Sequence, residues 1–160
     1  MNKILRKAIE LREQGKFSES RMLLIPLIDI DEVKARAHLH IAWSYDNQGY
    51  ESDAVVHYEA ALSIGLEADE LFDAVFGLAS TLRSLGEYSE ALALFERAVV
   101  SFPEKVEVKP FYAMCLYNVG EHKKAMEILL NLLIDNTDAE DILNYQRAIR
   151  LYAMDLDRTW

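Results

Sequence analysis

The sequence predicts an all-α protein built as a solenoid of stacked helix pairs, and three observations support this prediction. Four glycines, spaced 34, 37 and 34 residues apart, each begin a similar short segment. Such a fixed period is typical of repeat architectures. Each segment lies between stretches whose apolar residues recur every three or four positions, as on one helix face. Of the 160 residues, 51% are hydrophobic and 28% charged, as in a globular protein. We therefore expect one domain over residues 1–160.

The glycine segments mark the turn inside each helix pair, since glycine ends a helix by adopting a left-handed conformation without a steric clash. They begin at Gly15, Gly49, Gly86 and Gly120. The expected pairs span 2–14 with 18–30, 34–48 with 52–64, 70–85 with 89–101, and 106–119 with 122–134. The repeats are thus expected at about 1–33, 34–69, 70–105 and 106–137.

Three features depart from a regular repeat. Pro26 lies inside the second expected helix and should kink or end it, because proline cannot continue the backbone hydrogen bonding. Three extra residues fall between the second and third repeats, and we expect them to lengthen the connection around 65–69. Pro110 should occupy the first turn of its helix.

A single capping helix is expected over about 138–156. Its apolar stripe includes Ile142, Tyr145 and Ile149, and Thr137 with Glu140 has the spacing of a capping box. A stack of helix pairs needs such a helix to cover its last exposed face.

The third repeat carries the fullest pattern of large, small and turn residues: Leu78, Ala79, Leu82, Gly86, Tyr88, Ala91, Phe95, Ala98 and Pro103. This pattern resembles the tetratricopeptide repeat, and the other repeats keep parts of it, so the resemblance covers nearly the whole chain. It implies a right-handed α–α superhelix. More narrowly, 79–86 and Phe102-Pro103 are similar to small bacterial tetratricopeptide proteins of unassigned role, which implies a bacterial cytoplasmic protein.

Composition excludes several classes of function. The chain has 17 basic and 27 acidic residues, a net charge of −10, whereas nucleic acid requires a basic face. Its longest apolar run, 22–28, is far shorter than the ~20 residues of a membrane span. The first residues lack the apolar core of a signal peptide. We therefore expect neither nucleic acid nor membrane as a partner.

No arrangement of residues predicts catalysis. His38 and His40 are two positions apart and so lie on different helix faces, unlike the paired histidines of a zinc motif. Cys115 lies in an apolar helical stretch, which favours a buried, inert thiol. A glycine-rich phosphate loop is absent from the sequence. We predict no enzyme activity, no catalytic residue, no metal site and no cofactor.

The resemblance implies that the first helix of each pair lines a concave groove that binds a protein or peptide. The side chains expected there are rich in aromatic residues, arginine and asparagine, a composition typical of binding hot spots. They are Leu5, Arg6, Ile9, Arg12, Arg36, Leu39, His40, Trp43, Asn47, Phe76, Ser80, Arg83, Phe111, Met114, Tyr117, Asn118 and, closing the end, Tyr145. An alternative stays open, in which Trp43 and Phe76 belong to the core.

The residues of the first helices and the distribution of charge along the chain bear on two further kinds of partner. The family's carboxylate clamp for chaperone tails is absent, because its places hold Leu5, Ile9, His40, Asp73 and Gly77. Residues 1–21 carry a net charge of +3 and the remainder −13. This asymmetry permits head-to-tail self-association as a weak homo-oligomer, with an assembly role as the alternative function. An ordinary solvated surface explains the same charges.

Overall fold

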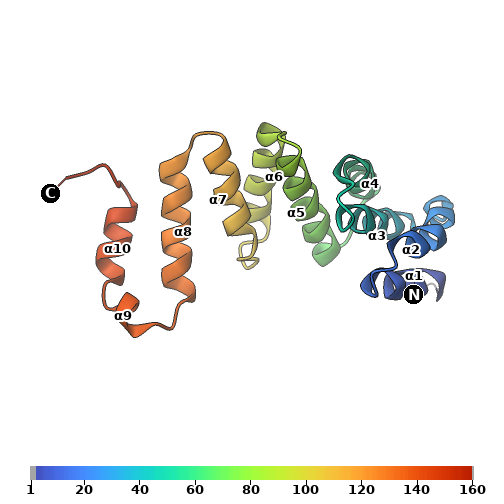
Figure 1. Ribbon diagram of the computed structural model, residues 1–160, viewed down its shortest axis with the longest axis horizontal. Helices are drawn as coiled ribbons and strands as arrows, with labels where there is room; N and C mark the ends of the chain where they lie inside the picture. Colours follow the sequence, from blue (N-terminus) through green and yellow to red (C-terminus); the bar gives the residue numbers. More distant parts are fainter. Residues whose placement is uncertain (1–2, 160) are drawn as a thin grey trace. The chain divides into compact units, whose positions relative to one another are not determined.

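The computed structural model describes residues 3–159, and all regular secondary structure in that range is helical (Figure 1). The chain forms two compact units, Met1–Leu94 and Phe95–Trp160, with the division inside one helix. A single continuous domain therefore stays a prediction. Within the described range, every helix is too short or too polar to cross a membrane.

Unit 1 contains three first helices and the second helices that follow them. The elements are α1 (Lys3–Glu13), α2 (Phe17–Leu24), the 3-10 helix η1 (Ile25–Asp29), α3 (Lys34–Asp46), α4 (Glu51–Ile64), α5 (Ala68–Ser84) and the first part of α6 (Tyr88–Ser101). Helix α3 contacts both α1 and α5, while α2 packs on α1 and α3, and α4 packs on α3 and α5. The first helices thus form one layer and α2 and α4 another (Figure 1).

The turns inside the pairs form as the glycine spacing predicts. Gly86, for example, has a φ of 85°, a conformation that side chains with a Cβ rarely adopt. Its N–H donates to the Arg83 carbonyl at 3.1 Å, and the Glu87 N–H donates to the Leu82 carbonyl at 2.9 Å. These bonds satisfy carbonyls at the end of α5.

Small residues are buried at the joints between helices that the repeat pattern predicts. The alanines that the repeat places at the joints are all buried: Ala42, Ala54, Ala61, Ala79, Ala91, Ala98, Ala113 and Ala125. Larger apolar side chains fill the space between them, and one such cluster joins α1, α2, η1 and α3 through Leu5, Leu24, Leu27 and Ile41. The apolar stripes therefore build the core between layers.

Pro26 acts as predicted, whereas the extra residues do not. Helix α2 ends at Leu24, and the chain continues as η1 with Pro26 near its start. The connection before α5 is only three residues, 65–67, while α5 is 17 residues long against 13 in α3. The expectation of a longer connection was wrong, because the extra residues continue the helical pattern at the start of α5.

Unit 2 consists of the end of α6 with α7 (Val108–Asn118), α8 (His122–Asn136), α9 (Glu140–Leu143) and α10 (Gln146–Ala153). Pro110 is the third residue of α7, so its placement in the first turn is confirmed. The prediction of a single capping helix is wrong, since α9 ends at Leu143 and a separate α10 begins at Gln146. Thr137 does not cap it, because the N-cap of α9 is Ala139.

The second of these two helices, α10, is held against α8. The Arg150 guanidinium donates to Asn131 Oδ1 at 2.9 Å and to Asp135 Oδ1 at 2.7 Å. Ala153 on α10 is also buried. These contacts hold α10 against α8, and the break after α9 lets the chain turn to reach them (Figure 1).

Candidate functional site

Some of the side chains that the sequence predicts for a binding groove belong to the core. Leu5 and Leu39 are fully buried, which corrects their placement on a binding surface. Leu5 packs in the cluster with Leu24 and Leu27, because α2 and α3 both cover α1. His40 is also buried, with 5% of its surface exposed.

The other predicted residues of unit 1 keep part or all of their surface. They define what we call the first-helix face of unit 1: Arg6, Ile9, Arg12, Arg36, Trp43, Asn47, Phe76, Ser80 and Arg83. Arg6 and Asn47 are exposed, and the remaining seven are half-buried. Trp43 and Phe76 thus lie between the two alternatives of core and open surface.

Three predicted residues from α1 and α3 come together around one indole ring. The Arg12 guanidinium lies over the Trp43 ring, with its Cζ 5.0 Å from the ring centroid. The His40 ring meets Trp43 edge-on, with centroids 5.0 Å apart and planes at 72°. The pKa of His40 is lowered to about 3, chiefly by burial and also by the charges of Arg12 and Arg36. His40 is therefore neutral at pH 7.

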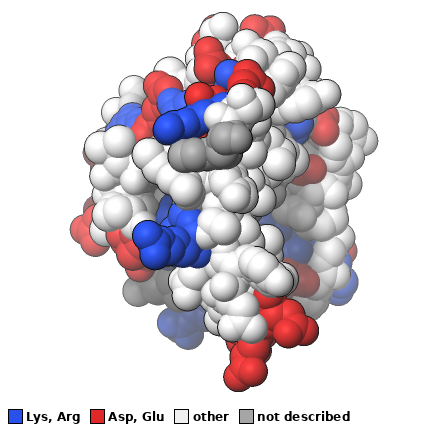
Figure 2. All heavy atoms as spheres, turned by 90° about the vertical axis from the view of Figure 1, so that its left-hand side faces the viewer, with Lys and Arg blue, Asp and Glu red and all other residues white. Residues whose placement is uncertain are grey.

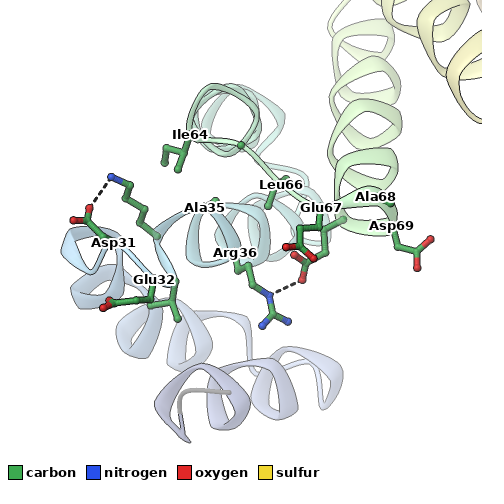
Figure 3. Close-up of a pocket in the computed structure, with 13 residues that line it drawn as sticks. Asp31, Glu32, Ala35, Arg36, Ile64, Leu66, Glu67, Ala68 and Asp69 are labelled. Atoms are coloured by element: carbon green, nitrogen blue, oxygen red, sulfur yellow. Dashed lines mark hydrogen bonds and ion pairs between the residues drawn. The ribbon is translucent and has the colours of Figure 1, made fainter.

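Arg36 is held by a partner that sequence reasoning missed. Its Nε donates to Glu70 Oε1 at 2.5 Å, and both side chains are about one third exposed. Figure 3 shows this ion pair beside Glu67 and Leu66. The two residues lie 34 positions apart on α3 and α5, and no motif in the sequence links them. Phe76 stacks on Phe72 of the same helix, with ring centroids 5.6 Å apart.

A cavity of about 980 Å³ opens where α3 and α5 begin, and its lining comes from segments 31–36 and 64–70 (Figure 3). Five of its lining residues are acidic and two are basic. Lys34 pairs with Asp31 at 2.8 Å on its rim. This cavity could not be predicted from the sequence, because it forms only where two repeats lie side by side.

A second polar cluster joins α3, α4 and α5. Asp46 accepts hydrogen bonds from the Tyr58 hydroxyl at 2.6 Å and from Thr81 Oγ1 at 2.9 Å. Burial raises the pKa of Asp46, and the two hydrogen bonds oppose that rise. Burial and the Asp46 charge raise the pKa of Tyr58. Since Tyr58 is fully buried, this cluster fixes the joint between repeats and is not a contact surface.

Replacing Tyr58 with phenylalanine is expected to lower the free energy of unfolding by about 1.5 kcal/mol, because Asp46 loses one of its two donors. Urea denaturation monitored by far-ultraviolet circular dichroism measures this change. Tyr50→Phe is the matched control, since Tyr50 is 52% exposed and its change should stay within about 0.5 kcal/mol. Equal stability of the two variants would contradict a role for the Tyr58 hydroxyl.

His38 and His57 form a pair on the helices α3 and α4. Their Nδ1 atoms are 2.9 Å apart, and the Tyr45 ring stacks on His57 with centroids 5.8 Å apart. Burial lowers the pKa of both histidines. Over residues 3–159, no group of three or more potential ligands comes together to hold a metal ion. At the distance between the two Nδ1 atoms, the N–H of one imidazole donates a hydrogen bond to the unprotonated nitrogen of the other.

In unit 2, the predicted residues on α7 and at α10 are largely open. Met114, Tyr117 and Tyr145 are 39%, 64% and 69% exposed, while Phe111 and Asn118 are half-buried. The Tyr117 ring contacts His122 at the start of α8, with centroids 4.8 Å apart. Figure 2 views the side on which Figure 1 draws the C-terminus, and wide uncharged areas separate the charged groups there. Uncharged surface of this kind suits contact with another chain.

The comparisons with known proteins agree with this architecture. A family model for the tetratricopeptide repeat matches residues 35–156. A search of curated proteins finds no significant match. Among solved structures, YrrB is 21% identical, with a TM-score of 0.76 over 97% of this chain and 77% of that chain. It is described as a tetratricopeptide repeat protein with an unusual peptide-binding site.

Two further structures share the fold. MamA is 17% identical, with a TM-score of 0.73 over 96% of this chain and 90% of that chain. A tetratricopeptide repeat protein from Parabacteroides merdae is 15% identical, with a TM-score of 0.71 over 94% of this chain and 59% of that chain. The predicted all-α superhelix is thereby confirmed.

This fold is in general a non-enzymatic module for protein–protein interaction. The family model covers well over half of the chain and includes three of the four repeat turns. The chain therefore belongs to the tetratricopeptide repeat proteins.

Proposed function

We propose that the chain binds a peptide or protein segment on its first helices and carries out no reaction. The observation that carries this proposal is the half-buried Trp43 with Arg12 over its ring and His40 at its edge. Aromatic and arginine side chains that keep open surface are typical of binding hot spots. YrrB, which shares the fold, is described as having a peptide-binding site, and this supports peptide binding by this chain.

The residues proposed to contact the partner are those of the first-helix face of unit 1. Apolar contact with Trp43 and Phe76 supplies affinity, while Arg6, Arg12 and Asn47 supply hydrogen bonds to the partner. In unit 2, Phe111, Met114, Tyr117, Asn118 and Tyr145 are proposed to act in the same way. Leu5 and Leu39 are left out because they are buried.

Trp43→Ala is expected to weaken binding more than it weakens the fold. A peptide is first selected by phage display on the immobilised full chain, and its Kd is then measured by fluorescence anisotropy. We expect a loss of about ten-fold or more, since the indole is a half-buried aromatic anchor. Phe111→Ala tests unit 2 in the same way.

Val56→Ala is the matched control, because Val56 is 61% exposed on α4, outside the first helices. Its Kd and its unfolding curve should equal those of the wild type. If Trp43→Ala leaves the Kd unchanged and lowers the free energy of unfolding by several kcal/mol, Trp43 belongs to the core and the proposed surface is wrong.

A further inference from the structure

The cavity where α3 and α5 begin, which we call the α3–α5 cavity, combines apolar and acidic side chains. Its volume of about 980 Å³ is large enough to take in several side chains of another molecule. Its apolar lining includes Val33 and Leu66, which are half-buried, and Ile64, which is 40% exposed. The cavity therefore offers apolar contact as well as charge.

The acidic side chains of the lining are only partly neutralised by the basic ones. Lys34 pairs with Asp31 at 2.8 Å, and Arg36 pairs with Glu70 at 2.5 Å. Both cations of the lining are thus used by carboxylates of the same lining. Because five carboxylates face two cations, the lining keeps a net charge of −3.

Helix structure does not account for two of the remaining carboxylates. Asp69 and Glu70 lie in the first turn of α5, where the helix dipole favours negative charge. Glu67 is the N-cap residue of α5 but forms no side-chain cap hydrogen bond, and Glu32 precedes Val33, the N-cap residue of α3. Within residues 3–159, the side chains of Glu32 and Glu67 form neither an ion pair nor a hydrogen bond. They are available to a ligand.

The contacts inside the cavity indicate which ligand chemistry it takes. Glu70 already accepts a hydrogen bond from the Arg36 guanidinium, and both side chains are about one third exposed. In Figure 3, Glu32 and Glu67 lie on either side of this ion pair. A second cation seated there gains charge-assisted hydrogen bonds to carboxylates. Lysine and arginine also have long apolar stems, which suit the apolar part of the lining.

We propose that the α3–α5 cavity holds a lysine or arginine side chain of the segment that binds the first-helix face of unit 1. The two surfaces are continuous, because Arg36 belongs to that face and also lines the cavity. The inference rests on the proposed function and specifies the charge of one residue of the partner. An acidic residue is disfavoured at this place, since it would meet the net charge of −3.

Nuclear magnetic resonance of the ¹⁵N-labelled full chain at low ionic strength tests the cavity directly. Three alanine pentapeptides with blocked ends serve as probes, with a central Arg, a central Lys or a central Gln. We expect the Arg or Lys peptide to shift the backbone amide signals of Gly65 and Leu66, with a Kd about ten-fold lower than that of the Gln peptide. Whichever of the two binds more tightly identifies the cation.

The double variant Glu32→Gln with Glu67→Gln should remove this preference, so that all three peptides bind alike. Its matched control is Glu59→Gln with Glu90→Gln, because these exposed residues of α4 and α6 lie outside the cavity lining. Both double variants remove the same charge, so a control that keeps the preference separates a local site from attraction by the net charge of −10. Urea denaturation checks that both variants fold.

The outcomes separate this inference from the proposed function. If the Gln peptide binds as tightly as the other two, or if both double variants lose the preference equally, the proposal for the cavity is wrong. The proposed function still stands in that case if a peptide selected by phage display loses affinity on Trp43→Ala. If Trp43→Ala leaves that affinity unchanged while the Glu32 and Glu67 variant alone loses the preference for cations, the surface around the indole is wrong and the cavity remains a cation site.

Discussion

Gly77→Ala is expected to lower the free energy of unfolding by about 1–2 kcal/mol, although alanine is the better helix former by ~1 kcal/mol. Gly77 lies in the middle of α5, and a methyl group added there would be 2.6 Å from Cζ and from the hydroxyl oxygen of Tyr58, and 2.7 Å from Cε1. Tyr58 cannot move aside easily, because it is fully buried and its hydroxyl is bonded to Asp46. Overpacking therefore outweighs helix propensity.

Urea denaturation of the full chain measures this loss, and Ser84→Ala is the control on the same helix. Ser84 is exposed, so its replacement should change stability by no more than about 0.5 kcal/mol. The double variant Gly77→Ala with Tyr58→Ala should lose less than the sum of the two single variants, because removing the ring removes the clash. A stabilised Gly77→Ala variant would contradict the close approach of α4 and α5 at this point.

The repeat was predictable from sequence because its determinants are local. A glycine with positive φ can be recognised without knowing what surrounds it, and Gly86 ends its helix as expected. The effect of Pro26 is equally local, since a proline beyond the first turn lacks the N–H that the α-helix needs there. Apolar periodicity likewise identifies which helix faces are buried, although not what each face meets.

The candidate site was predictable only in part, because its geometry depends on how helices from different repeats are aligned. The sequence placed Arg12 and Trp43 on first helices, but their contact across α1 and α3 is a tertiary feature. Leu5 occupies a repeat position that predicts an exposed groove residue, yet α2 covers it. The packing of α10 is a tertiary feature as well, because Arg150 donates to two acceptors on α8 that local sequence does not reveal.

Lowering the pH from 7 to 4 is expected to cost the wild type about 3 kcal/mol of stability through His40 alone. Burial, with the charges of Arg12 and Arg36, lowers the pKa of His40 from 6.5 to about 3 in the folded chain. Between these two values the unfolded chain binds a proton that the folded chain does not, so stability falls as pH falls. The contribution is fully present above pH 6.5 and is lost progressively down to about pH 3.

Because burial lowers the pKa of His38 and His57 too, the effect of His40 is isolated by comparison with variants at that residue. His40→Asn and His40→Phe do not titrate, so their free energies of unfolding should fall less steeply with pH than that of the wild type. Both are compared because one keeps a polar group beside Trp43 and the other keeps a ring, and the change in slope should be the same in each. Parallel pH profiles for the wild type and both variants would contradict the lowered pKa of His40 in the folded chain.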